Sequence, residues 1–236
     1  MNSGTLLEGE TPRHGFQGDR NRPTVVRGPA CMTIALSREA GARGNSIAVR
    51  LGKRLGWQVY TQELLEFMAM NDGAQQQLFA ELPPDAAMWA ERQMDRLRLD
   101  QVVRSESELG ELPHLMLMLA SRGEVVIVGR GAGYLLPSES TLHVRIVSPL
   151  PERIAYMGQW LRLTREQAAE EVRKRDQRRA EYLASSFRRP PAEPHAFDLV
   201  LNSSRLGEEV CADLIIQAMK SKEAARPDVD HGQQHV

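Results

Sequence analysis

Two apolar runs, each followed directly by a turn that contains glycine and arginine, limit most strongly what this chain can fold into. Residues 124–128 (EVVIV) are apolar almost without interruption, which is typical of a strand buried on both faces of a parallel sheet. Residues 31–36 (CMTIAL) predict a second strand, and a helical pattern at residues 45–55 follows its turn. Strands go on alternating with helices, so the sequence predicts an α/β protein whose parallel sheet is covered by helices on both faces.

Periodicity and capping residues predict the remaining elements. Strands are expected at residues 58–60, 142–147 and 197–201, and helices at residues 63–70, 88–109, 114–122, 151–163, 165–184 and 207–219. Asn45 is expected to cap the helix at residues 45–55 and Gly56 to end it. Thr164 and Gln167 have the spacing of a capping box that opens the helix at residues 165–184.

Length and composition indicate one soluble domain. The chain has 236 residues, of which 31–221 are expected to form the domain and 1–30 and 222–236 to be disordered tails. The formal net charge of −1 gives no reason to expect a nucleic-acid partner, and no apolar run is long enough to span a membrane. Cys31 and Cys211 give neither a disulfide framework nor zinc-ligand spacing. We therefore expect a cytoplasmic protein, while its oligomeric state stays open.

The first turn, residues 37–46 (SREAGARGNS), has the strand–turn–helix layout of a phosphate-binding loop but lacks the lysine of the Walker A pattern. Its glycines allow backbone N–H groups to face an anion, its arginines add positive charge, and its serines offer hydroxyl groups. The residues concerned are Ser37, Arg38, Gly41, Arg43, Gly44 and Ser46. On the residues alone, a phosphate cradle and an ordinary strand-to-helix connection are equally consistent.

Two further arginine-bearing segments are candidates for anion binding. Arg130 stands between Gly129 and Gly131 at the end of the strand 124–128, where its guanidinium can fork onto a phosphate. Arg173, Asp176 and Arg179 recur every third residue and so share a helix face. Charged helix runs are usually solvated faces, and that alternative stays open for residues 173–179.

Thr61 follows the expected strand 58–60 and is a candidate for an acceptor pocket, although its position favours a helix N-cap. Together with the arginine-bearing segments, it would lie at the carboxyl edge of a parallel sheet, where ligands bind in such folds. This convergence of positive charge is suited to phosphoryl transfer, which chiefly requires phosphates to be positioned and neutralised.

The order of these motifs resembles the cytidylate kinase-like family, relatives of bacterial cytidylate kinase among the nucleoside monophosphate kinases. Four stretches carry the resemblance: MTIALSREAGARGNSIAVRLGKRLGWQVYTQELL, VIVGRGAGYLLPSESTLHVRIVSPLPERI, VRKRDQRRAEYL and FDLVLNSSRLGEEVCADLI. They cover residues 31–221, and four motifs in the same order and spacing are more specific for the family than any one alone.

The resemblance implies a three-layer P-loop kinase fold with a helical acceptor-binding insert at residues 62–112 and an arginine-bearing lid at residues 164–190. It implies ATP with Mg²⁺ as donor and a nucleoside monophosphate, CMP or dCMP, as acceptor. The donor phosphates would lie against Ser37, Arg38, Gly41, Ala42, Arg43, Gly44, Asn45 and Ser46. The acceptor would contact Thr61, Gly129, Arg130 and Gly131. The catalytic arginines would be Arg43, Arg130, Arg173 and Arg179, with Asp176 supporting the lid.

Three departures from cytidylate kinase bear on this expectation. The loop lysine is absent, and Thr61 and Gly131 stand where aspartates are common. No metal ligand is therefore assigned, although Ser46 has a hydroxyl in a suitable place. A kinase is the leading hypothesis, and a nucleotide-binding regulatory protein without turnover and a kinase for a different small acceptor are the alternatives.

Overall fold

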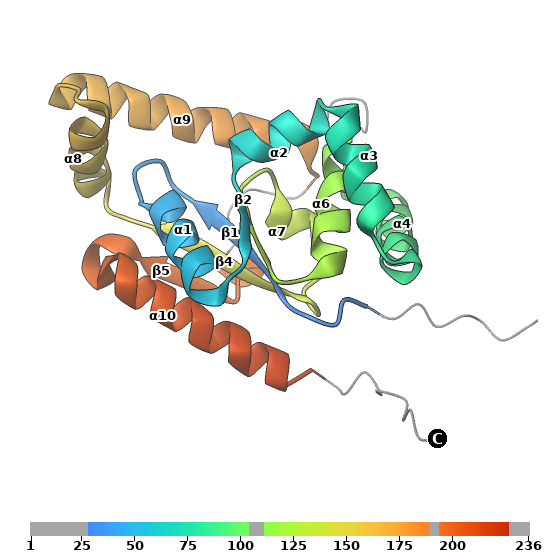
Figure 1. Ribbon diagram of the computed structural model, residues 1–236. Coiled ribbons are helices and arrows are strands. Elements are labelled where there is room, and N and C mark those ends of the chain that lie inside the picture. The colour runs from blue at the N-terminus through green and yellow to red at the C-terminus, as the bar shows by residue number, and fades with distance from the viewer. Residues whose placement is uncertain (1–27, 104–110, 189–193, 227–236) are drawn as a thin grey trace, which may run out of the picture.

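The computed structural model describes residues 28–103, 111–188 and 194–226. Five strands form one sheet in the order β2-β3-β1-β4-β5, and every neighbouring pair is parallel (Figure 1). The strands are β1 Thr33–Arg38, β2 Gln58–Tyr60, β3 Val125–Val128, β4 Thr141–Val147 and β5 Leu199–Asn202. The predicted α/β fold with a parallel sheet is confirmed.

Helices follow or precede almost every strand. Their bounds are α1 Gly44–Leu55, α2 Gln62–Ala69, α3 Asp72–Glu81, α4 Pro84–Leu99, α6 Leu112–Arg122, α7 Ala132–Leu135, α8 Leu150–Leu161, α9 Arg165–Ser186 and α10 Ser203–Ala224, with a short 3₁₀ turn at Pro194–Ala196. None of the helices in the described ranges is long and apolar enough to span a membrane.

The sheet separates two hydrophobic cores. Side chains alternate across a strand, so Val126 faces α1 and α10 whereas Ile127 faces α6 and α7. Ile47 of α1 and Ile215 of α10 are fully buried in the first core, and Met116 of α6 in the second. The resulting helix–sheet–helix layers explain why β3 is apolar at all four positions.

Helices α8 and α9 form a third packed unit. The capping box of Thr164 and Gln167 is present, as predicted, and opens α9. Met157 of α8 and Val172 of α9 are buried in the contact between the two helices. In Figure 1, α9 runs from α8 to α2 across one end of the sheet, so it covers the carboxyl edge of the strands.

Several boundaries differ from the sequence-based expectation. Helix α1 begins at Gly44 with Arg43 at the N-cap in a left-handed conformation, so Asn45 is not the cap. The helical insert is divided into α2, α3 and α4, and residues 104–110 of the expected long helix lie outside the described residues. Helix α10 continues to Ala224, beyond the expected boundary at 221. The expected tails lie mostly outside the described residues, at 1–27 and 227–236.

Arg226 joins the two ends of the described chain. Its guanidinium donates hydrogen bonds to the carbonyl oxygens of Pro29, at 2.6 Å, and Ala30, at 3.3 Å. Both cysteines are free thiols, and Cys211 is fully buried.

Candidate functional site

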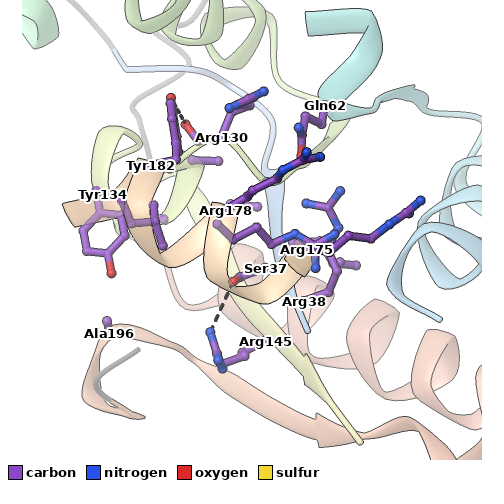
Figure 2. Close-up of a pocket in the computed structure, with 18 of the residues that line it drawn as sticks. Ser37, Arg38, Gln62, Arg130, Tyr134, Arg145, Arg175, Arg178, Tyr182 and Ala196 are labelled. Atoms are coloured by element: carbon purple, nitrogen blue, oxygen red, sulfur yellow. Dashed lines mark hydrogen bonds between the residues drawn. The ribbon is translucent and has the colours of Figure 1, made fainter. Parts of the chain in front are cut away.

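A cavity of about 500 Å³ lies at the carboxyl edge of the sheet, beneath α9 (Figure 2). The ends of β1 and β3, the start of α2 and one face of α9 supply its walls. Its lining contains two glutamates, Glu63 and Glu171, against six arginines. The arginines are Arg38, Arg130, Arg145, Arg175, Arg178 and Arg179. A cavity with this balance of charge is suited to an anionic ligand.

Arg38, the last residue of β1, is the most buried of these arginines, with 8% of its surface exposed. Within the described residues no carboxylate lies within ion-pair distance of it, and its buried Nε has no hydrogen-bond partner. Burial, followed by the positive charges of Arg179 and Arg130, lowers the pKa of Arg38 to about 9, so the side chain is still charged at neutral pH.

Gly129 makes room for that guanidinium. It follows β3 with φ +83°, and a Cβ at this position would collide with Nη1 of Arg38. The next glycine, Gly131, has φ +76°, and a Cβ there would collide with the Phe187 ring. The positive φ of both glycines favours glycine, and at Gly129 a larger residue would displace the Arg38 guanidinium. Gly131 is also the N-cap of α7, a short helix at a position where the sequence predicts only a turn.

Arg130 is held from two sides. It forms an ion pair with Glu66 of α2, and its guanidinium carbon lies 4.6 Å from the centre of the Tyr182 ring of α9. Its Nε is buried without a hydrogen-bond partner. These contacts join the insert, the β3 turn and α9 around one guanidinium, which keeps it directed at the cavity.

Asp176 ties α9 to the turn after β1. Its carboxylate accepts the backbone N–H of Ala40 at 2.8 Å and a hydrogen bond from Arg153 of α8 at 2.5 Å. Arg153 also donates to the carbonyl of Ala40 at 3.1 Å, so both backbone groups of Ala40 are held. Arg179 lies 3.6 Å from the same carboxylate. Asp176 therefore joins α9 to Ala40 and to α8, and its role in supporting a lid stays a prediction.

The predicted loop residues divide into two groups. Ser37 and Arg38 line the cavity, whereas residues 41–46 do not. Arg43 instead lies over the Tyr156 ring of α8, at 5.1 Å, and the Ser46 hydroxyl is 3.3 Å from the Tyr156 hydroxyl. No side chain caps α1 and its first turn has no acidic residue, so its N-terminal N–H groups are available to an anion.

The other predicted residues are placed unevenly. Gly129, Arg130, Gly131 and Arg179 line the cavity, but Arg173 is exposed on α9 and does not. The expected shared face of Arg173, Asp176 and Arg179 fails at its first member because α9 turns Arg175 and Arg178 toward the cavity instead. Thr61 caps α2, its hydroxyl accepting the N–H of Leu64, and the neighbouring Gln62 and Glu63 line the wall.

Two lining residues, Tyr182 and Arg145, and the partner of Arg130, Glu66, are not among the residues that the sequence predicts for the site. Tyr182 lies one helical turn beyond Arg179, so it could have been found by extending the face of α9. Arg145 is the one charged residue within the expected strand 142–147, which is an unusual position for a residue without a role. Glu66 gave no sequence signal, because its pairing with Arg130 depends on how α2 packs.

Glu63 and Glu66 provide limited compensation for the positive charge. Partial burial acts to raise the pKa of Glu63, but hydrogen bonds at the start of α2 and the charges of Arg38 and Arg130 outweigh burial and lower it. Within the described ranges there is no cluster of three or more histidine, cysteine, aspartate or glutamate side chains that could hold a metal ion. The excess of arginine over glutamate in the lining is suited to an anion.

The fold and the cavity define an α/β protein with a cationic pocket at the carboxyl edge of its parallel sheet. Residues 33–205 match the cytidylate kinase-like family, which is most of the chain. The protein belongs to the cytidylate kinase-like family, as its motifs predicted.

Two solved structures are similar to this chain at low sequence identity. An uncharacterized protein from Eubacterium ventriosum is 18% identical, with a TM-score of 0.56 over 80% of this chain and 98% of the other. Shikimate kinase from Acinetobacter baumannii is 14% identical, with a TM-score of 0.42 over 81% of this chain and 94% of the other, which is too low to support an argument. The first likeness establishes the fold alone.

A curated relative is similar over a shorter region. Uronate isomerase from Corynebacterium glutamicum is 28% identical over 107 residues, which are 45% of this chain and 21% of that protein. The chain thus spans about a fifth of the length of this relative, and the activity named for the relative does not transfer.

Proposed function

We propose that the protein transfers the γ-phosphoryl group of ATP to a nucleoside monophosphate, with CMP or dCMP as the acceptor. The observation that carries this proposal is the cluster of Arg38, Arg130 and Arg179, whose burial leaves guanidinium nitrogens without hydrogen-bond partners. A buried charge without a counter-charge is costly, and among the described residues Arg38 has none. A bound phosphate would supply negative charge to Arg38 and hydrogen-bond acceptors to all three arginines.

The acceptor phosphate would lie against Arg38 and Arg130. Both side chains are fixed before any ligand arrives, Arg38 by its packing on Gly129 and Arg130 by Glu66 and Tyr182. A preorganised guanidinium loses little side-chain entropy on binding. Thr61, as the cap of α2, would act on the acceptor only indirectly, by fixing Gln62 and Glu63 in the wall.

The donor would be held by residues 37–46 and the first turn of α1. The uncapped N-terminus of α1 and the adjacent cluster of buried guanidiniums fit a polyphosphate. Bound ATP would supply the phosphoryl group and Mg²⁺ would neutralise phosphate oxygens. The Ser46 hydroxyl, which lies 3.3 Å from the Tyr156 hydroxyl, would be the protein's own ligand to Mg²⁺, and phosphate oxygens and water would supply the others.

Helix α9 would serve as the lid. Arg179 would act on the transferring phosphoryl group, while Asp176 and Arg153 keep the helix seated on Ala40. A seated helix excludes water from the cavity, which would suppress hydrolysis of the donor.

A second candidate function is nucleotide binding without turnover. The loop has no lysine, Arg43 packs on Tyr156 outside the cavity, and the Asp176 carboxylate occupies the N–H of Ala40. These three features favour a regulatory protein that has kept the fold and its anion site.

Phosphoryl transfer from Mg-ATP to a panel of nucleoside monophosphates, beginning with CMP and dCMP, separates the two functions. A kinase gives nucleoside diphosphate, and Arg43→Ala shows whether the loop arginine contributes. A folded protein that binds ATP and CMP but yields no product would establish the second function.

Arg130→Ala tests the assignment of the acceptor site. Loss of a charged hydrogen-bond donor should weaken CMP binding about tenfold or more and ATP binding much less, as measured by titration calorimetry. Arg173→Ala, which removes the same side chain outside the cavity, is the matched control and should change neither affinity appreciably. If Arg130→Ala lowers the affinities for CMP and ATP equally, Arg130 does not belong specifically to the acceptor site.

A further inference from the structure

We propose that the acceptor carries two separate anionic groups, and that Arg145 binds the second. This inference rests on the proposed function in one respect, that the cavity is the acceptor site. The cluster of Arg38, Arg130 and Arg179 is called the first anion position below, and Arg145 with Ser37 and Phe197 the second anion position.

The carboxylates of the protein are distributed unequally among the six arginines of the cavity. Glu66 pairs with Arg130, Glu171 with Arg175 and Asp176 with Arg179. Among the residues that the structure describes, no carboxylate pairs with Arg38, Arg145 or Arg178. Arg178 is exposed and therefore hydrated, and Arg38 belongs to the first anion position. Arg145 is left as a half-buried cation without a counter-charge.

Arg145 is positioned as firmly as a binding residue needs to be. Its guanidinium carbon lies 5.6 Å from the centre of the Phe197 ring, and its Nη1 is 3.5 Å from the Ser37 hydroxyl (Figure 2). The register of the sheet fixes this pair, because Arg145 of β4 lies directly beside Ser37 of β1. The aromatic ring and the hydroxyl use one face and one N–H, which leaves several of the five guanidinium donors for a ligand.

The second anion position is separate from the first. Arg145 lies on β4 and Arg130 follows β3, and β1 runs between those strands. Neighbouring strands are about 4.8 Å apart, so the backbones of Arg145 and Arg130 are separated by roughly 10 Å. Arg38 lies on β1, next to β4, but it follows Ser37, the residue beside Arg145, and so its side chain starts from the opposite face of the sheet. A single phosphate does not reach both Arg145 and Arg130 symmetrically. A small molecule with anionic groups at its two ends does, and the cavity of about 500 Å³ has room for one.

The position also argues against a purely structural role for Arg145. A side chain needed only to cover Phe197 would not require a charge, and an arginine stays protonated at all physiological pH values. Keeping that charge half-buried beside five other arginines costs free energy unless an anion arrives. A nucleoside monophosphate that bears a further phosphate meets this requirement.

The test compares CMP with cytidine 3′,5′-bisphosphate, which adds one phosphate to the same nucleotide. Titration calorimetry on the full chain should show the bisphosphate binding about tenfold or more tightly than CMP, the gain expected from one charge-assisted contact. In Arg145→Gln, which keeps hydrogen-bonding capacity but loses the charge, the ratio of the two affinities should fall toward one. Arg145→Lys should retain part of the ratio.

Arg178→Gln is the matched control, because it removes one positive charge from the same cavity at an exposed position. It should lower both affinities together and leave their ratio high. Three results would each overturn the proposal: a ratio near one in the native protein, a high ratio in Arg145→Gln, or a ratio in Arg178→Gln that falls as far as it does in Arg145→Gln.

Failure of this inference is distinguishable from failure of the proposed function. If the protein phosphorylates CMP but binds the bisphosphate no more tightly than CMP, the proposed kinase activity is supported and the second anion position is refuted. If neither nucleotide binds, titration with inorganic phosphate decides. One equivalent fewer in Arg145→Gln than in the native protein supports the second anion position, and the same number of equivalents in the two proteins refutes it.

Discussion

Arg38 holds a buried positive charge at neutral pH, and Gly129 leaves the space that its guanidinium occupies. The two residues end neighbouring strands, β1 and β3, so their closeness follows from the sheet rather than from the local sequence. The arginine supplies attraction for an anion, and the glycine fixes where that attraction is applied.

Gly129→Ala should therefore damage the site beyond its cost in stability. The added Cβ meets the Arg38 guanidinium, and an alanine at φ +83° is itself strained by about 1–2 kcal/mol. We expect weaker binding of phosphate-bearing ligands, by about tenfold, measured by calorimetry together with the free energy of unfolding in urea.

Gly56→Ala is the control for this change. Gly56 has φ +73° and an added Cβ would have nothing within 4 Å, so the strain is similar but the site is untouched. Equal ligand affinity in the two variants would show that Gly129 is needed only for its backbone conformation and not to make room for the Arg38 guanidinium.

At the scale of elements, the contact between α9 and the turn after β1 decides how closed the cavity is. Asp176 accepts the N–H of Ala40, and Arg153 holds the carbonyl of the same residue. Both contacts come from helices that are far from β1 in sequence. The turn is thus ordered by the helices that cover it.

Asp176→Ala should free the Ala40 amide. Removing the acceptor of a charge-assisted hydrogen bond should speed hydrogen exchange at Ala40 by about tenfold or more, observed by NMR. Glu171→Ala removes another carboxylate from α9, one that pairs with Arg175 only, and should leave the Ala40 amide unchanged. Slow exchange at Ala40 in Asp176→Ala would mean that Arg153 alone holds the turn.

Most elements were predictable because their signals are local. The apolar run at 124–128, the capping box at Thr164 and the stop at Gly56 each specify a strand, a start or an end within a few residues. The N-cap of α1 was misplaced, since Arg43 adopts a left-handed conformation at the position where its side chain packs on Tyr156. That contact depends on how α8 docks, which no local pattern encodes.

The site was predictable only in part, because several of its contacts join segments that are distant in sequence. Arg130 and Gly129 follow directly from a strand end, and the sequence places such residues at the ligand-binding edge. Arg145 reaches the cavity because the register of the sheet places it beside Ser37. Glu66 reaches Arg130 because of how α2 packs. Arg173 shows the opposite error, because a spacing of three residues does not say which face of a helix is turned inward.

For the molecule as a whole, one buried histidine links stability to pH. His143 of β4 is 6% exposed, and its Nδ1 has no hydrogen-bond partner. Burial lowers its pKa from the ordinary 6.5 to about 4, so the folded protein holds it neutral. Unfolded chains bind a proton there at a higher pH than folded ones do.

Stability should consequently fall as the pH drops from about 6.5 toward 4, because the unfolded state gains a proton that the folded state resists. The contribution of His143 amounts to about 3 kcal/mol across that window. Urea unfolding at a series of pH values measures it, and His143→Gln should flatten the slope. His195→Gln, at an exposed position, should keep the native slope, and an unchanged slope in His143→Gln would assign the effect to other groups.

The bond between Arg226 and the carbonyls of Pro29 and Ala30 has a practical consequence. It brings the two ends of the described chain together before β1, at the edge of the sheet opposite the arginine-lined cavity (Figure 1). The backbone is thus nearly a closed ring. A circular permutant that bridges these ends, or a molecule tethered to a surface at this corner, would present its ligand entrance to open solution.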